Sequence, residues 1–183
     1  LRSETDIPFT LMGYYNPIFQ MGVEGFCQRA MEVGADGIII VDLPPEEAEA
    51  LLEAVSDCDL ATIFLVAPTS TSNRIVRIAE LSKGFIYCVS VTGVTGVRNV
   101  ISDEVRSMVT EIRKHTGKPI CVGFGVSTPD QAKRVAQIAD GVIVGSAIVK
   151  VIEENLDDES AMLLNVKRFA EGLAKSVKEI TVP

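Results

Sequence analysis

The stretch from residue 119 to residue 149 holds one pattern twice: Pro-Ile-Cys-Val-Gly-Phe-Gly-Val-Ser at 119–127 and Gly-Val-Ile-Val-Gly-Ser-Ala-Ile-Val at 141–149. Each copy is a short apolar run, typical of a strand buried on both faces, followed by a glycine loop. A third glycine loop, Gly93-Val94-Thr95-Gly96, follows the preceding apolar run. Amides of such loops bind phosphate, because glycine lets the backbone approach the anion closely. We expect a phosphate site here, with the Ser146 hydroxyl as a further donor, although tight β/α turns alone would also explain the glycines.

Apolar runs and amphipathic stretches alternate along the whole chain. The runs expected as strands are Pro8–Met12, Gly37–Val41, Ala61–Val66, Phe85–Val89, Pro119–Val122 and Gly141–Val144. The stretches expected as helices are Val23–Val33, Pro45–Ser56, Ser72–Leu81, Ser102–His115, Pro129–Ile138 and Ser160–Val177, with a short helix from Ser146 through Ile148. Six consecutive β/α units without a linker predict one parallel sheet in a single domain over residues 1–183.

The positions of the glycine loops separate the two folds built from such units. A doubly wound nucleotide-binding sheet carries its glycine loop after the first strand, whereas here the first run leads into Gly13-Tyr14-Tyr15-Asn16-Pro17. The glycine loops follow the last three runs, where (β/α)8 barrels build their common phosphate site. The expected fold class is α/β, a phosphate-binding (β/α)8 barrel. A full barrel takes about 250 residues, so we expect an incomplete one: part of a longer protein, or a truncated chain with open sheet edges.

Composition excludes several classes of partner. A net charge of -8 and a pI of about 4.7 argue against nucleic acid and anionic membranes, which require a basic face. No apolar run approaches the roughly 20 residues of a membrane helix, and the first residues lack a signal-peptide pattern, so we expect a cytoplasmic protein. Four cysteines without C-x-x-C spacing predict buried free thiols and no metal site: Cys27, Cys58, Cys88 and Cys121. The acidic run Glu153–Glu159 is expected as a solvated loop without a ligand.

Five segments, in order through essentially the whole chain, together resemble the tryptophan synthase α subunit family. They are Pro8-Phe9-Thr10-Leu11-Met12-Gly13-Tyr14-Tyr15-Asn16-Pro17, Val41-Asp42-Leu43-Pro44, Ser90-Val91-Thr92-Gly93-Val94-Thr95-Gly96, Gly123-Phe124-Gly125 and Gly145-Ser146-Ala147-Ile148-Val149-Lys150. The resemblance implies a retro-aldol lyase that cleaves indole-3-glycerol phosphate to indole and glyceraldehyde 3-phosphate in tryptophan biosynthesis. It implies a barrel whose first two β/α units are absent from this chain.

The same resemblance implies which residues bind substrate. Loop amides at Gly96, Gly125, Gly145 and Ser146 would hold the phosphate. Met12, Phe124 and Ile143 would line the indole pocket, with Tyr87 beside it. An apolar slot suits the flat indole ring while the phosphate anchors the other end of the substrate. Ordinary barrel core is the alternative interpretation of Met12, Phe124 and Ile143.

No catalytic residue is expected in this chain. The family's catalytic Glu on strand 2, and its Asp in the loop that follows, lie in the segment that is missing here. Asp42 stands at the C-terminal end of a strand, which is the catalytic face of a barrel. The plainer interpretation is that Asp42 caps the helix starting at Pro44-Pro45, and the resemblance places it on the surface facing the partner. Val91, where many bacterial members have arginine, leaves a free-standing indole-releasing lyase open.

The resemblance implies the tryptophan synthase β subunit as partner in an α2β2 complex. Pyridoxal phosphate is expected in that β subunit and no cofactor in this chain, and a plant protein of this kind would lie in the plastid. Two other functions remain open. One is a non-catalytic phosphate-binding barrel fragment that docks to a β subunit, and the other is a barrel isomerase or epimerase of phosphosugars.

Overall fold

A computed structural model describes residues 1–56, 58–89, 103–123 and 125–179. The chain divides into two compact units. The first comprises Leu1–Val66, Ser70–Tyr87 and His115–Lys118, and the second comprises Ala67–Thr69, Cys88–Lys114 and Pro119–Pro183. The expectation of a single domain over residues 1–183 stays a prediction.

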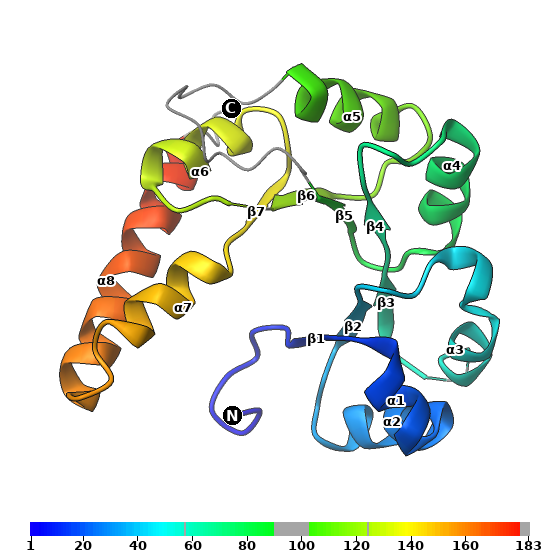
Figure 1. The fold of residues 1–183 in the computed structure, drawn as a ribbon, viewed down its shortest axis with the longest axis horizontal. Coiled ribbons are helices and arrows are strands. Elements are labelled where there is room, and N and C mark those ends of the chain that lie inside the picture. The colour runs from blue at the N-terminus through cyan, green and yellow to red at the C-terminus, as the bar shows by residue number, and fades with distance from the viewer. Residues whose placement is uncertain (57, 90–102, 124, 180–183) are drawn as a thin grey trace. The chain divides into compact units, whose positions relative to one another are not determined.

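Helices and strands alternate along the chain as the sequence predicts (Figure 1). Through the first unit the elements are β1 (Thr10–Gly13), α1 (Tyr15–Met21), α2 (Val23–Glu32), β2 (Gly37–Ile40), the 3-10 helix η1 (Pro45–Glu47), α3 (Glu49–Ala54), β3 (Ala61–Ile63), β4 (Leu65–Val66) and α4 (Ser72–Leu81). They continue with β5 (Ile86–Val89), α5 (Asp103–Arg113), β6 (Ile120–Gly123), α6 (Pro129–Ala136), β7 (Gly141–Ile143), α7 (Ser146–Glu153) and α8 (Glu159–Lys178). Strand order follows chain order in both sheets, β1-β2-β3 and β4-β5-β6-β7.

The first unit is built on a parallel sheet with β2 at its centre. Met12 of β1 lies opposite Ile39 of β2, and Ile38 of β2 lies opposite Thr62 of β3. All four residues of β2 are buried, as a near-continuous apolar run predicts for a central parallel strand. The β1 residues Thr10, Leu11 and Met12 are exposed in contrast.

One helix of the first unit was not predicted from the sequence. The first helix expected from the sequence is Val23–Val33, but Tyr15–Met21 already forms α1. Its proline, Pro17, falls in the first turn, where a missing N–H costs no helical hydrogen bond. The amide of Tyr15 donates to Asp42 Oδ1 at 2.7 Å. The expectation that Asp42 caps the helix at Pro44-Pro45 is therefore wrong, since η1 has no side-chain cap.

Two predicted elements of the first unit are divided. The expected strand Ala61–Val66 is interrupted at Phe64, whose amide donates to Ser82 Oγ at 3.3 Å. The expected helix Pro45–Ser56 is split at Ala48 into η1 and α3. In the second unit α7 runs past its expected end at Ile148 to Glu153. The remaining elements agree with the predicted ranges to within three residues at each end.

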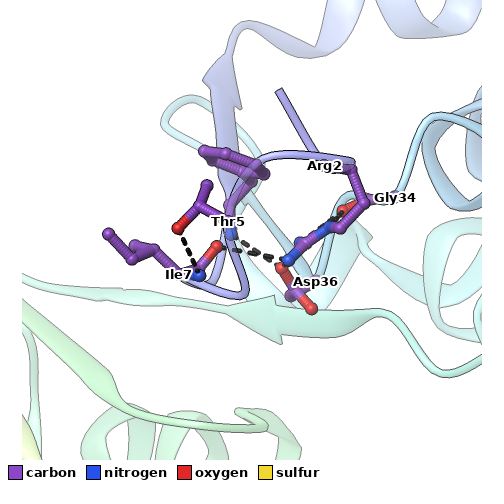
Figure 2. A network of polar contacts seen from close by, with 6 residues as sticks. Arg2, Thr5, Ile7, Gly34 and Asp36 are labelled. Atoms are coloured by element: carbon purple, nitrogen blue, oxygen red, sulfur yellow. Dashed lines mark hydrogen bonds and ion pairs between the residues drawn. The ribbon is translucent and has the colours of Figure 1, made fainter.

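The segment before β1 is held by Arg2 (Figure 2). The Arg2 guanidinium donates to the Gly34 carbonyl oxygen, at 3.0 Å from Nε, and pairs with the Asp36 carboxylate. Asp36 Oδ2 also accepts a hydrogen bond of 2.7 Å from the amide of Phe9. The Phe9 amide, and with it Arg2, holds the pKa of Asp36 below its ordinary value. Asp36 thus connects the start of β2 to the residue that precedes β1.

The second unit repeats this arrangement. Asp140 Oδ2 accepts from the amide of Ile120 at 2.8 Å, and both Asp140 oxygens accept from Arg113, at 3.0 and 2.9 Å. Burial acts to raise the pKa of Asp140, but the hydrogen bonds from Arg113 and Ile120 outweigh it and lower the pKa. Both aspartates stand in an Ala-Asp-Gly sequence whose glycine is the first residue of a strand. The aspartates of these Ala-Asp-Gly sequences therefore connect neighbouring strands.

Apolar side chains from β6, α5 and α8 contribute to the core of the second unit. Ile120 and Val122 of β6 are buried, as are Val109 and Ile112 of α5 and Leu173 of α8. Helix α8 packs against α6 and α7. Among the described residues, no helix combines the length and apolar character required to span a membrane.

Candidate phosphate-binding site

The two glycine loops of the second unit leave the sheet at the same edge. Strands β6 and β7 are parallel neighbours, and Gly123 at the end of β6 lies opposite Ile143 at the end of β7. The carboxyl ends of parallel neighbours meet at one edge of the sheet. The loops that carry Gly125 and Gly145 therefore start side by side.

The loop after β6 has a defined conformation. Gly125 has a φ of 74°, in the left-handed region that favours glycine. The next residue, Val126, is buried. A capping box then starts α6, in which Thr128 Oγ1 accepts from the Gln131 amide at 3.3 Å. Gln131 Oε1 accepts from the Ser127 amide at 2.8 Å, so these bonds hold the loop between Gly125 and α6.

The loop after β7 ends directly at a helix N-terminus. Gly145 is the N-cap of α7 and provides no side-chain cap. Its carbonyl oxygen accepts from the amides of Ile148 at 2.9 Å and Val149 at 3.2 Å. The amides of Ser146 and Ala147 therefore precede the first helical hydrogen bonds and face outward from the helix start. Amides in this position, at the positive end of the helix dipole, bind anions.

The glycines of this unit differ in what requires them. A Cβ on Gly141 would lie 2.6 Å from Cys121 Sγ, so strand packing requires glycine there. Gly125 is required by its backbone conformation. A Cβ on Gly145 would meet no described atom within 4 Å, and its φ of -117° lies outside the left-handed region that favours glycine. Tight packing within the described part of the protein therefore does not explain Gly145, whereas close approach by a ligand would.

The other predicted site residues are distributed over the chain. Ile143 is half-buried at the end of β7 in the second unit, and Met12 of β1 in the first unit is 58% exposed. Tyr87 of β5 belongs to the first unit and is buried, which raises its pKa. Gly96 and Phe124 lie outside the described residues. The structure places Gly125, Gly145, Ser146 and Ile143 along one edge of the β6–β7 pair, and their role in binding stays a prediction.

The four cysteines are free, as predicted. Burial of Cys88 raises its thiol pKa to about 12. Burial, together with the neighbouring Cys58 and Glu24, raises the thiol pKa of Cys27 to about 11. Cys58 and Cys121 are partly exposed rather than fully buried as expected. The described residues contain no group of three or more metal-ligating side chains.

A family model for the tryptophan synthase alpha chain matches residues 1–178. The chain belongs to this family. The tryptophan synthase alpha chain of Geotalea uraniireducens (strain Rf4) is 54% identical over 159 residues, which are 87% of this chain and 60% of the relative. The solved tryptophan synthase alpha chain of Legionella pneumophila subsp. pneumophila has a TM-score of 0.87 at 34% identity, covering 100% of this chain and 67% of that one. A solved Pyrococcus furiosus structure, described as the structural basis of mutual activation of the tryptophan synthase a2b2 complex, has a TM-score of 0.85 at 35% identity. It covers 95% of this chain and 69% of that one.

These comparisons confirm the family resemblance and the fold class. The structural neighbours support an α/β chain of the (β/α)8 barrel type that carries part of the barrel. The chain spans 60% of the length of the Geotalea tryptophan synthase alpha chain. The activity, substrate and partners of the whole protein are therefore given below as proposals.

One contact near the C-terminal end of α7 has no signature in the sequence. The run Glu153–Glu159 was expected as a solvated loop, but within it Asn155 accepts a hydrogen bond from Asn165 of α8 at 2.8 Å. No local pattern marks either asparagine, because their partnership depends on how α7 and α8 pack.

Proposed function

We propose that this chain provides the phosphate-binding part of a lyase that cleaves indole-3-glycerol phosphate to indole and glyceraldehyde 3-phosphate in tryptophan biosynthesis. Membership in the tryptophan synthase alpha chain family supports the reaction. The observation that carries the proposal is the shared edge at which Gly125 and the Gly145–Ser146 helix start leave β6 and β7.

The phosphate binds the loop amides of Gly125, Gly145 and Ser146, together with that of Gly96. An overall charge of -8 does not prevent this, because the attraction is local. Amides and the positive end of the α7 dipole act over the first turn. The exposed Ser146 adds its hydroxyl as a further donor.

The indole end of the substrate contacts apolar side chains, to which we assign Met12, Tyr87, Phe124 and Ile143. The reaction breaks the bond between indole C3 and the glycerol chain. A proton is added at C3, and the glycerol hydroxyl next to the broken bond loses its proton to become the aldehyde. This requires acid and base groups, which we assign to the family's Glu and Asp and to no residue of this chain. The residues present hold and orient the substrate, a contribution that itself lowers the barrier.

The β subunit of tryptophan synthase is the proposed partner, in an α2β2 complex. One structural neighbour belongs to a tryptophan synthase complex from Pyrococcus furiosus. Pyridoxal phosphate belongs to the β subunit in this proposal. Size-exclusion chromatography of the chain mixed with a tryptophan synthase β subunit tests the partnership: an earlier-eluting peak containing both proteins is expected, and two unchanged peaks would exclude docking by this chain.

Gly145→Asp tests the phosphate site directly. A negative charge at a helix N-terminus interacts favourably with the helix dipole, and aspartate is a good N-cap residue. The Gly145→Asp substitution is therefore not expected to destabilise α7. A bound phosphate would meet a second negative charge, and the affinity for indole-propanol phosphate, measured by calorimetry, is expected to fall at least about tenfold. Gly117→Asp is the matched control, since a Cβ there also meets no described atom within 4 Å. Equal affinities of Gly145→Asp and the unsubstituted chain would refute the site.

The choice of ligand separates this function from a phosphosugar isomerase or epimerase. Indole-propanol phosphate is expected to bind more tightly than ribulose 5-phosphate, because the indole ring buries apolar surface that a sugar lacks. The opposite order would favour the sugar enzyme.

A further inference from the structure

Helix α7 carries the proposed phosphate-binding amides but is weakly held by packing. It is apolar along most of its length, yet none of its eight residues is buried, and Val149 is 61% exposed. A short helix of this kind needs specific contacts to keep one position. Such contacts are found at its C-terminal end.

Asn155 makes four hydrogen bonds just beyond that end. Its side-chain Nδ2 donates to the Val151 carbonyl oxygen at 2.8 Å, and its Oδ1 accepts from Asn165 Nδ2 at 2.8 Å. The backbone amide of Asn155 donates to the Ile152 carbonyl oxygen at 3.0 Å, and the Asn155 carbonyl oxygen accepts from the amide of Asp158 at 3.2 Å. The side-chain bonds connect the last turn of α7 to α8, and both are partly buried.

Helix α8 is itself well anchored. Its N-cap Asp158 accepts from the Ala161 amide at 3.0 Å. Leu173 and Ser176, towards its C-terminal end, are buried, and the helix packs against α6. Asn165 therefore presents its carboxamide from a fixed position.

We propose that Asn155 and Asn165 are positioning residues that set the α7 N-terminus for phosphate binding. The inference rests on the proposed function. An eight-residue helix is about 12 Å long and behaves as a rod, so rotation at the Asn155 end displaces Gly145 and Ser146 at the other. Hydrogen bonds from these amides weaken steeply with misalignment. Loss of the Asn155–Asn165 bond therefore lowers phosphate affinity without removing any group that touches phosphate.

Calorimetric titration of the 183-residue chain with glycerol 3-phosphate tests this inference. Asn165→Ala removes the bond and is expected to weaken binding about three- to tenfold. Asn165→Gln keeps a carboxamide donor and is expected to recover part of the affinity. If Asn165→Ala does not fold by circular dichroism, Asn165→Ser takes its place.

Leu173→Ala is the control for general loosening of α8. It removes a buried side chain from the same helix, away from the Asn155 contact, and is expected to lower the melting temperature while leaving glycerol 3-phosphate affinity unchanged. Equal losses of affinity in Leu173→Ala and Asn165→Ala would overturn the positioning role, as would unchanged affinity in Asn165→Ala. An unsubstituted chain that binds neither glycerol 3-phosphate nor indole-propanol phosphate would overturn the proposed function instead, and this inference with it.

Discussion

The Asp42 carboxylate accepts a hydrogen bond from the backbone amide of Tyr15 at 2.7 Å, although the two residues are 27 positions apart. Tyr15 is the first residue of α1, and Asp42 follows β2. The N-cap residue itself, Tyr14, makes no side-chain cap. A carboxylate that follows the neighbouring strand β2 therefore does for α1 what an N-cap side chain does in most helices.

Asp42→Ala is expected to destabilise the first unit. It leaves the Tyr15 amide without its acceptor, and loss of a helix cap typically costs about 1 kcal/mol. Urea unfolding followed by circular dichroism measures the change. Asp42→Asn retains an acceptor oxygen and is expected to cost less, so equal stability of all three proteins would show that the bond contributes nothing.

Acid is expected to weaken the connections made by Asp36 and Asp140. Both carboxyls have a folded-state pKa below the ordinary value of 3.8. Folding therefore favours their ionised forms, so their stabilisation is complete above the unfolded pKa and is lost as pH falls through the lowered folded pKa. The free energy of unfolding, measured from about pH 6 down to about pH 2, should fall less steeply below about pH 4 in Asp140→Asn than in the unsubstituted chain. An unchanged slope in Asp140→Asn would contradict the assignment.

Packing of β6 against β7 is expected to depend on the absence of a side chain at Gly141. An added Cβ would lie 2.6 Å from Cys121 Sγ, and overpacking of this kind typically costs about 1–3 kcal/mol. Gly141→Ala should therefore lower the melting temperature. Adding Cys121→Ala removes the clashing sulfur and should restore part of the loss, and a double variant no more stable than Gly141→Ala would place the cost elsewhere.

Cys88 is expected to be inert in the folded protein. The thiolate is the reactive form, and burial raises the Cys88 pKa to about 12. At pH 8, iodoacetamide labelling followed by peptide mass spectrometry should modify Cys88 only after unfolding in urea. The partly exposed Cys58 should react earlier and is the internal reference. Rapid native labelling of Cys88 would show that β5 is accessible to solvent.

Much of the fold followed from local patterns. Apolar runs and amphipathic stretches predicted most strands and helices to within three residues, and α4 agreed at both ends. Helix α1 was missed because its start is stabilised by Asp42, a residue remote in sequence. The strand over Ala61–Val66 was interrupted because Ser82 Oγ replaces a strand partner for the Phe64 amide.

Local patterns also predicted part of the candidate site. Glycine loops after consecutive strands mark Gly125, Gly145 and Ser146, and the parallel register of β6 and β7 brings their loops to one edge. Binding roles stay predictions for the four residues of the expected indole pocket, Met12, Tyr87, Phe124 and Ile143. An apolar side chain that packs in the core and one that contacts a ligand are of the same residue types, so the sequence does not distinguish them.

The sequence by itself determined the alternation of strands and helices, the glycine loops and the family, because apolar spacing and turn residues act over a few neighbouring positions. Only the tertiary structure decided three contacts: Asp42 accepts from the first amide of α1, Cys121 leaves no room for a side chain at Gly141, and Asn165 donates to Asn155. These contacts join residues between 10 and 27 positions apart. Their geometry exists only once the elements have packed, so no local pattern encodes it.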